Sequence, residues 1–268
     1  MIINGNKIAA DIFQQTKNKI DNLNFTPKLS IITYSPNFVT EKYLHLKCDK
    51  ASWLGIETEI IKLKSDASTL SVIEIIKKIS PNTNGIIVQL PLLLGVDLDK
   101  VLKSIPIHLD PDAFSYVSSP ASAPCLPPVV GAIEEISKFY NINFCHKEVV
   151  ILGQGRLVGK PAAVFTENLG AQVKIVTEHE GSLSDLSSAD LIISGIGKPG
   201  FIKPEQVKEG VVIFDAGTSE TNGVLSGDVK KTVADKASFF TPVPGGIGPI
   251  TISYLFRNLV LLFSQGCE

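Results

Sequence analysis

The chain has 268 residues, of which 44% are hydrophobic and 19% charged, a composition typical of a folded globular protein with ample core. Its 25 Lys and Arg against 27 Asp and Glu give a net charge of −2, so we expect no nucleic-acid partner. Lys7 and Asp11 stand where a signal peptide needs an apolar stretch. The apolar tail 251–263 is short for a bilayer span and is interrupted by Arg257 and Asn258. We therefore expect a cytoplasmic protein without membrane insertion.

The four cysteines, Cys48, Cys125, Cys145 and Cys267, show none of the spacings that zinc ligands require. No neighbouring histidines complete such a set of ligands. The sequence therefore predicts no metal site, and it favours reduced thiols in a cytosolic compartment.

Short β-rich runs alternate with amphipathic stretches in the first half, which predicts a parallel sheet covered by helices. The expected strands are 28–35, 57–63 and 85–92, and the expected helices are 40–54, closed by Gly55, and 69–79. The region 104–128 is rich in proline, alanine and serine, and is predicted to be a loop or a domain junction.

The second half restarts with a helical segment, 131–140, and a continuous apolar run, 148–152, typical of a buried parallel strand. Further strands are expected at 171–177, 189–195 and 211–217, a hairpin turn at Asn222-Gly223, and a last helix at 251–264 after the loop 242–249. The pattern predicts two α/β domains with a boundary near Pro127.

A glycine-rich loop follows the expected strand 148–152. Gly153, Gly155 and Gly159 have the spacing GxGxxxG, and Pro161 suits the first turn of a helix. Glycines here let the backbone approach a pyrophosphate, which the helix N-terminus then attracts. Because GxGxxG is the more common spacing, a turn that merely needs small residues is the alternative to a dinucleotide site.

The cofactor that such a loop would bind follows from the charges around it. The next strand leads into Glu178, whose carboxylate suits the hydroxyls of an adenosine ribose. A 2′-phosphate requires an arginine or several donors, and a nearby carboxylate repels it. Gln154 is neutral and Glu180 acidic, whereas Arg156 and Lys160 favour the opposite choice. The balance favours NAD over NADP.

Thr40, Tyr43 and Lys47 lie at i, i+3 and i+7, so the expected helix 40–54 brings them onto one face. An aromatic ring there can stack on a planar ligand, and a partly desolvated lysine of lowered pKa can exchange protons near neutrality. On spacing alone, an amphipathic helix whose lysine reaches solvent is the alternative.

Several motifs occur in one order along the chain. They are Tyr43-Leu-His-Leu-Lys47, GIIVQLPL (85–92), Asp110-Pro-Asp112, GxGxxxGxP (153–161), GKPG (197–200) and TPVPGGIGPIT (241–251). Together they resemble the bifunctional methylenetetrahydrofolate dehydrogenase/methenyltetrahydrofolate cyclohydrolase family over essentially the whole chain. The segments VQLPL and PVPGGIGPIT are the most specific of these motifs.

The resemblance implies an α/β fold of two domains. One is an N-terminal catalytic domain that binds folate (1–126, completed by the last helix, 250–268), and the other is a Rossmann-like NAD(P)-binding domain with a parallel sheet (127–249). The implied reaction oxidises 5,10-methylenetetrahydrofolate to the methenyl form with NAD or NADP, and then hydrolyses it to 10-formyltetrahydrofolate. The resemblance also implies a homodimer.

The resemblance further assigns roles to single residues around the folate. Lys47 is implied as the central catalytic group, tuned by a hydrogen bond with Gln89, while Tyr43 would stack on the folate and Asp112 would hold the pterin nitrogens. In isolation, Gln89 could instead tie down a loop and Asp112 could cap a turn. The remaining implied substrate-binding residues are Thr40, Pro244, Gly245 and Gly248, and the implied cofactor-binding residues are Gly153, Gln154, Gly155, Arg156, Gly159, Glu178 and Thr218.

Some positions depart from the family pattern. Thr40 stands in place of a serine, and Ala113-Phe114-Ser115, the segment 116–123 and Cys125-Leu126-Pro127 replace the usual residues near the folate site. Gln154-Gly155 replaces the arginine and serine of NADP-using members, which agrees with a preference for NAD. Because the catalytic set is intact, we expect an active enzyme. The alternatives are a folate- or nucleotide-binding module without turnover and an unrelated NAD-dependent oxidoreductase.

Overall fold

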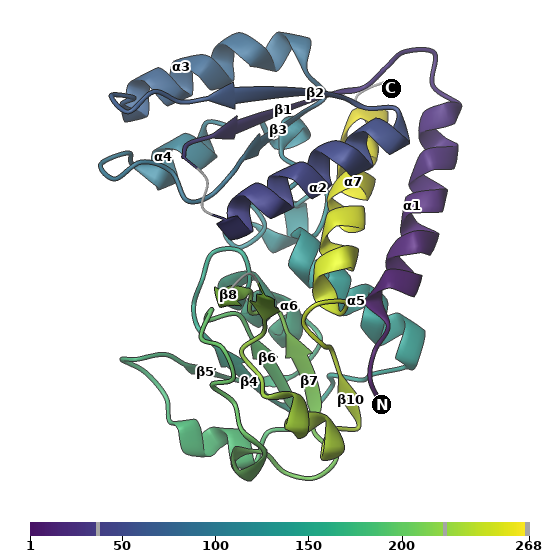
Figure 1. The fold of residues 1–268 in the computed structure, drawn as a ribbon, viewed down its shortest axis with the longest axis vertical. Helices are drawn as coiled ribbons and strands as arrows, with labels where there is room; N and C mark the ends of the chain where they lie inside the picture. Colours follow the sequence, from purple (N-terminus) through teal and green to yellow (C-terminus); the bar gives the residue numbers. More distant parts are fainter. Residues whose placement is uncertain (36–37, 222–223, 266–268) are drawn as a thin grey trace. The chain divides into compact units, whose positions relative to one another are not determined.

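The computed structural model describes residues 1–35, 38–221 and 224–265, and its chain divides into two compact units. One comprises Asp11–Pro127 and the chain from Ser253 onward, and we call it the three-strand unit. The other, the five-strand unit, comprises Met1–Ala10 and Pro128–Ile252. Helices α1 (Gly5–Asp21) and α7 (Ile247–Gln265) each have residues in both units (Figure 1).

The three-strand unit contains a parallel sheet in the order β2-β1-β3 (Figure 1). Its elements are β1 (Lys28–Thr33), α2 (Phe38–Leu54), β2 (Glu57–Lys62), α3 (Thr69–Ile79), β3 (Gly85–Val88) and α4 (Leu98–Lys103). The central strand β1 is buried along nearly its whole length, including its polar residues Ser30 and Thr33, as is typical of the central strand of a parallel sheet.

Most elements of this unit agree with the sequence predictions, and the differences have local causes. α3 has the predicted bounds, and its N-terminus is capped by the side chain of Ser68, which accepts a hydrogen bond from the Ser71 amide. β3 ends at Val88 rather than continuing to 92, because Pro91 has no N–H for the ladder. The region 104–128 forms a loop with two short 3₁₀ turns, as predicted. Helices α1 and α4 were not predicted.

The five-strand unit contains a parallel sheet in the order β10-β7-β6-β4-β5 (Figure 1). Its elements are α5 (Pro128–Tyr140), β4 (Glu148–Leu152), α6 (Gly159–Asn168), β5 (Gln172–Val176), β6 (Leu191–Ser194), β7 (Val212–Asp215) and β10 (Phe239–Phe240). The chain leaves β4 for β5 on one side and then crosses to β6 on the other. The carboxyl ends of β4 and β6 are therefore a topological switch point, where doubly wound sheets bind ligands.

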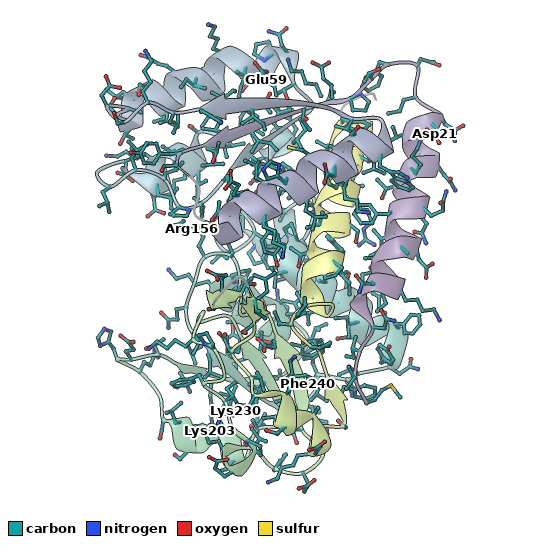
Figure 2. The ribbon with its side chains drawn as sticks, viewed as in Figure 1. Asp21, Glu59, Arg156, Lys203, Lys230 and Phe240 are labelled. Atoms are coloured by element: carbon teal, nitrogen blue, oxygen red, sulfur yellow. The ribbon has the colours of Figure 1, made fainter. Side chains whose placement is uncertain are left out.

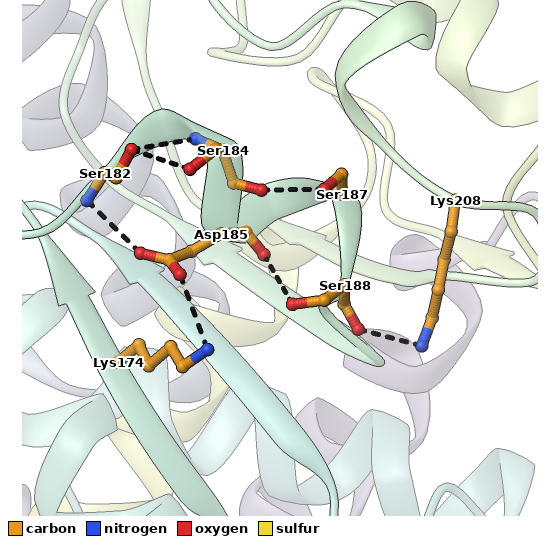
Figure 3. A network of polar contacts seen from close by, with 7 residues as sticks. All are labelled: Lys174, Ser182, Ser184, Asp185, Ser187, Ser188 and Lys208. Atoms are coloured by element: carbon orange, nitrogen blue, oxygen red, sulfur yellow. Dashed lines mark hydrogen bonds and ion pairs between the residues drawn. The ribbon is translucent and has the colours of Figure 1, made fainter.

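A 3₁₀ turn (Leu183–Ser187), held by side chains, lies in the connection between β5 and β6 (Figure 3). Asp185 Oδ2 accepts from the Ser182 amide at 3.2 Å, and Asp185 Oδ1 accepts from Lys174 Nζ at 3.4 Å. Farther on, β8 (Ser219–Thr221) and β9 (Val224–Ser226) form an antiparallel pair, as expected for a hairpin. The predicted turn Asn222-Gly223 and the cysteine Cys267 lie outside the described residues.

Helix α7 corrects one expectation from the sequence. It begins at Ile247, earlier than predicted, and its window Ile247–Ser264 has a mean hydropathy of 1.4 over 18 residues. By length and composition alone, this helix could therefore cross a membrane. However, 61% of the window is buried inside the protein, as is usual for a core helix. The expectation that the tail is too short was wrong, whereas the absence of membrane insertion stays a prediction.

Candidate functional site

Lys47 and Gln89 contact each other in the three-strand unit, as predicted. Lys47 Nζ, on α2, donates a hydrogen bond to Gln89 Oε1 at 2.9 Å. Gln89 directly follows β3, and its amide donates to the Ile32 carbonyl at 2.8 Å, so the sheet fixes its backbone. Its side-chain Nε2 donates to the Leu90 carbonyl at 3.4 Å, a long bond that leaves Oε1 directed toward the lysine. The strand register therefore determines where the lysine finds its partner.

Asp112 completes this group through its charge. Burial lowers the pKa of Lys47, and the negative charge of Asp112 opposes that change. Burial likewise raises the pKa of Asp112, and the positive charge of Lys47 opposes it. The amine is thus easier to deprotonate than that of an exposed lysine, while it keeps an acidic neighbour.

The first aspartate of the motif, Asp110, lies deeper than the second. Its side chain is 4% exposed, and burial followed by the charge of Asp112 raises its pKa to about 7. The Phe114 amide donates to Asp110 Oδ2 at 2.7 Å, which opposes this rise. Nearby, burial followed by the charges of Asp110 and Asp112 raises the pKa of Cys125 to about 12, so its thiol is neutral and unsuited to nucleophilic attack.

The other predicted residues of α2 are partly or fully buried. Thr40 is 9% exposed, and Tyr43 and Lys47 are partly exposed. All three belong to the same helix, as the spacing predicted. Pro244, Gly245 and Gly248 instead lie at the start of α7 and just before it, in residues of the five-strand unit. There the Gly245 carbonyl accepts from the Gly5 amide at 2.9 Å, and Gly245 has φ +98°, a conformation that favours glycine.

The glycine loop connects β4 to α6, as predicted for a dinucleotide-binding turn. Gly153 has φ +89°, and a Cβ added to Gly159 would lie only 1.9 Å from the Gly153 carbonyl oxygen. Only glycine therefore fits at Gly159, where the helix begins against the loop. Gly155 faces open space, and Gln154 and Arg156 are exposed in the same loop. Arg156 is labelled in Figure 2. The loop thus leaves its backbone accessible next to a helix N-terminus, which suits a pyrophosphate.

Two exposed carboxylates after β5 make polar contacts with neighbouring loops. Glu178 Oε1 accepts from Lys198 Nζ at 2.6 Å, and this contact lowers the pKa of Glu178. Gln154 Nε2 donates to Glu180 Oε2 at 2.9 Å. The sequence pointed to Arg156 and Lys160 as cations near this position and not to Lys198. The sequence did contain a signal for Lys198, because this residue belongs to the GKPG motif, which directly follows a predicted strand.

Two fully buried aspartates were also missed: Asp215, at the end of β7, and Asp228, shortly after β9. Asp228 Oδ2 accepts from Ser194 Oγ at 2.7 Å and from the Ile196 amide at 2.8 Å, and its Oδ1 accepts from the Lys198 amide at 2.8 Å. Asp215 accepts from the amides of Gly217, Asp228 and Val229 at 3.0–3.1 Å, and burial raises its pKa to about 7. The pair therefore holds the backbone of GKPG and of the segment that leads to Thr218.

Room for these carboxylates depends on glycines. A Cβ added to Gly217 would lie 2.1 Å from the Asp228 carboxyl carbon, and one added to Gly227 would lie 2.1 Å from Asp215 Oδ2.

As for metals, the parts of the chain that the structure describes contain no group of three His, Cys, Asp or Glu side chains able to hold an ion.

Comparison with known proteins identifies the family. The catalytic domain of the tetrahydrofolate dehydrogenase/cyclohydrolase family matches residues 3–112, and its NAD(P)-binding domain matches residues 124–266. The chain belongs to this family. The resemblance predicted from the sequence is confirmed, and with it the bifunctional dehydrogenase and cyclohydrolase function.

Relatives of the tetrahydrofolate dehydrogenase/cyclohydrolase family match along nearly their whole length. The bifunctional protein FolD of Mycoplasma mobile is 32% identical over 274 residues, which cover 99% of this chain and 98% of the relative. The crystal structure of the Campylobacter jejuni enzyme has a TM-score of 0.92 at 29% identity, with 99% of both chains covered. The Trypanosoma brucei enzyme, complexed with NADP cofactor and inhibitor, has a TM-score of 0.92 at 26% identity, with 100% and 98% covered. The predicted two-domain α/β fold is confirmed.

Proposed function

We propose that Lys47 is the proton-transfer group of this enzyme, with Gln89, Asp112 and Tyr43 as its partners at the folate. The substrate is 5,10-methylenetetrahydrofolate, which the enzyme oxidises to the methenyl cation and then hydrolyses to 10-formyltetrahydrofolate. The observation that carries the proposal is the 2.9 Å hydrogen bond from Lys47 Nζ to Gln89 Oε1, beside a carboxylate that shares the lysine's partly buried surroundings.

In the hydrolysis, the Lys47 amine accepts a proton from the water molecule that adds to the methenyl carbon. It then donates a proton to the ring nitrogen as the bond from that nitrogen to carbon breaks, and the remaining hydroxyl proton leaves for solvent as the formyl C=O forms. A lysine with an ordinary pKa would be protonated and a poor base at neutral pH. The burial that lowers the pKa of Lys47 therefore favours this step.

Asp112 and Tyr43 have a binding role in this proposal. The Asp112 carboxylate accepts hydrogen bonds from the amino and ring nitrogens of the pterin, and the Tyr43 ring stacks on the planar system. Thr40 is a further proposed folate-binding residue, and Pro244, Gly245 and Gly248 are also proposed to bind folate. Two neighbouring carboxylates resist ionising together, and the raised pKa of Asp110, about 7, means that Asp112 carries the negative charge of the pair first as the pH rises.

The dehydrogenase half requires a nicotinamide cofactor, which supplies the acceptor for the hydride of the methylene bridge. The loop from Gly153 to Gly159 fits its pyrophosphate, because Gly159 has no space for a side chain and the α6 N-terminus adjoins the loop. Gln154, Gly155, Arg156 and Thr218 complete the proposed binding set.

We further propose that NAD is the preferred cofactor. Glu178 and Glu180 put two carboxylates near the ribose position, and a 2′-phosphate would be repelled by both. Glu178 is ion-paired with Lys198, which keeps the carboxylate charged and engages the cation that could otherwise attract a phosphate.

We also propose a cytoplasmic homodimer that binds neither nucleic acid nor membranes. The net charge of −2 supports the absence of a polyanion partner, and the homodimer rests on the family resemblance alone. Light scattering on the purified protein tests the oligomeric state, and a mass of one chain would contradict it.

The deciding experiment supplies purified protein with 5,10-methylenetetrahydrofolate and either NAD⁺ or NADP⁺, and follows reduced cofactor and the methenyl chromophore together. Reduction of NAD⁺ with little methenyl accumulation is expected. Preference for NADP⁺ would contradict only the role given to Glu178. Tight folate binding without turnover with either cofactor would instead indicate a binding module.

A further inference from the structure

Helix α7 carries a buried amide in an otherwise apolar stretch. Asn258 is 2% exposed, and its helix neighbours Phe256, Leu259 and Val260 are equally buried. A buried amide is costly unless its hydrogen-bonding groups are satisfied. In the sequence, Asn258 only interrupts the apolar tail.

The side chain of Asn258 joins two backbone positions that are distant from it in the sequence. Its Nδ2 donates to the Pro111 carbonyl at 3.0 Å and to the Leu126 carbonyl at 2.8 Å. Pro111 stands between Asp110 and Asp112, and Leu126 lies at the end of the loop that departs from the family pattern. One side chain therefore anchors both ends of the segment 111–126.

The turn that presents Asp112 has a strained backbone. Ala113 has φ +54°, in the left-handed region that favours glycine. The Ala113 amide donates to the Asp110 carbonyl at 3.1 Å, and the Phe114 amide donates to Asp110 Oδ2 at 2.7 Å. A non-glycine residue stays in this conformation only when its surroundings hold it there. The turn thus depends on its two anchors, Asp110 from within and Asn258 from α7.

We propose that Asn258 is a positioning residue, which acts through the Pro111 carbonyl to hold Asp112 in its place beside Lys47. This inference deepens the proposed function and rests on it for the role of the lysine. If Asp112 moves away, Lys47 loses a negative neighbour, and the folate loses the carboxylate proposed to bind its pterin. Both the folate KM and the titration of the lysine should then change.

Few charged or titratable groups influence the pKa of Lys47. Lys47 faces Asp112 and Cys48, and it is hydrogen-bonded to Gln89. Asp112 in turn adjoins Asp110 and the neutral Cys125. Since Asp112 raises the pKa of Lys47 against the effect of burial, its displacement lowers that pKa further. The limb of the pH–rate profile that belongs to the lysine then moves to lower pH.

The test compares Asn258→Leu with Leu262→Ala, a buried site one turn farther along α7. Leucine has the branched shape of asparagine in a somewhat larger volume and removes the Nδ2 donor of both hydrogen bonds. We expect Asn258→Leu to raise the folate KM about tenfold and to move the lysine limb to lower pH, with the KM for the dinucleotide unchanged. Leu262→Ala creates a cavity, so it should lower the Tm and leave the KM values and pH profile as in the wild type.

A second variant separates positioning from general damage. Adding Ala113→Gly to Asn258→Leu relieves the strained turn, and part of the lost folate affinity should return. If Asn258→Leu does not fold, Asn258→Ser, which keeps one donor, takes its place. Wild-type KM and pH profile in the folded variant, or the same changes in Leu262→Ala, would overturn the proposal.

An NMR titration of the Lys47 side chain measures its pKa without turnover. If the wild type shows no activity, the proposed function fails, yet the titration still decides the positioning role. A lower Lys47 pKa in Asn258→Leu supports that role, and an unchanged pKa contradicts it.

Discussion

The two units hold their charged side chains in opposite ways. In the three-strand unit, burial is the main influence on Lys47, Asp112 and Asp110. In the five-strand unit, the ion pair of Glu178 and Lys198 has side chains that are 74% and 52% exposed. Burial shifts a pKa toward the neutral form, which suits proton transfer, whereas exposed ion-paired groups stay charged and act by attraction and repulsion. The difference matches a division between chemistry and cofactor recognition.

The five-strand unit also contains two buried aspartates, which are held in a third way. Asp215 and Asp228 are as buried as Asp110, but each accepts three hydrogen bonds, five of the six from backbone amides. Their carboxylates therefore serve the loop backbone rather than a proton-transfer step. Burial alone does not identify a catalytic group, and the partners must be counted as well.

The largest effect is expected from Lys47→Met, which removes the proposed proton-transfer group. Cyclohydrolase kcat should fall by about 10²–10⁴-fold, the usual range for a lost general acid–base. The Kd for NAD⁺, measured by fluorescence quenching, should stay as in the wild type, since Lys47 and the glycine loop belong to different units. A variant that keeps its hydrolysis rate would remove Lys47 from the mechanism.

Asp228→Ala tests the buried carboxylates of the five-strand unit. Three donors lose their acceptor, so the free energy of unfolding should fall by about 3 kcal/mol in urea denaturation, and the KM for NAD⁺ should rise. The control is Asp185→Ala, at the partly exposed cap of the 3₁₀ turn, which should cost about 1 kcal/mol and leave the KM unchanged. Equal losses in both variants would mean that burial is not what distinguishes Asp228.

The buried Asp110 makes stability depend on pH. Its folded-state pKa of about 7 lies above the unfolded value of about 3.9, so its favourable contribution is present below pH 4 and is lost as pH rises through 7. Asn at this position resembles the neutral acid. Asp110→Asn should therefore be more stable than the wild type at pH 8 by up to about 4 kcal/mol, with a difference near zero at pH 4, by urea denaturation. The same difference at both pH values would contradict the raised pKa.

The smallest effect is expected at the exposed pair. Glu178→Ser removes a carboxylate and frees Lys198, so the ratio of NADP⁺ to NAD⁺ activity should rise about tenfold, less so at high salt. Adding Lys198→Met should cancel most of this gain. If the double variant keeps it, the phosphate is bound by other cations, and Lys198 has no part in the preference.

Local pattern was enough to predict most of the elements. Helix α3 and strands β1, β2 and β4 to β7 lie where alternation, caps and apolar runs placed them. The two-residue strand β10 was missed, because two residues carry no period. The alternation of polar and apolar residues did not predict the early end of β3 at Val88 or the early start of α7 at Ile247.

The sequence by itself determined which residue types stand on one helix or in one loop. It put Thr40, Tyr43 and Lys47 on one face, because helical spacing depends only on near neighbours. Tertiary structure alone decided the partners of Asn258, Asp228 and Lys198, which come from other elements of the fold. Burial and the distance between charges depend on such remote neighbours, so the pKa of Lys47 and the position of Asp112 follow from the folded chain and not from spacing.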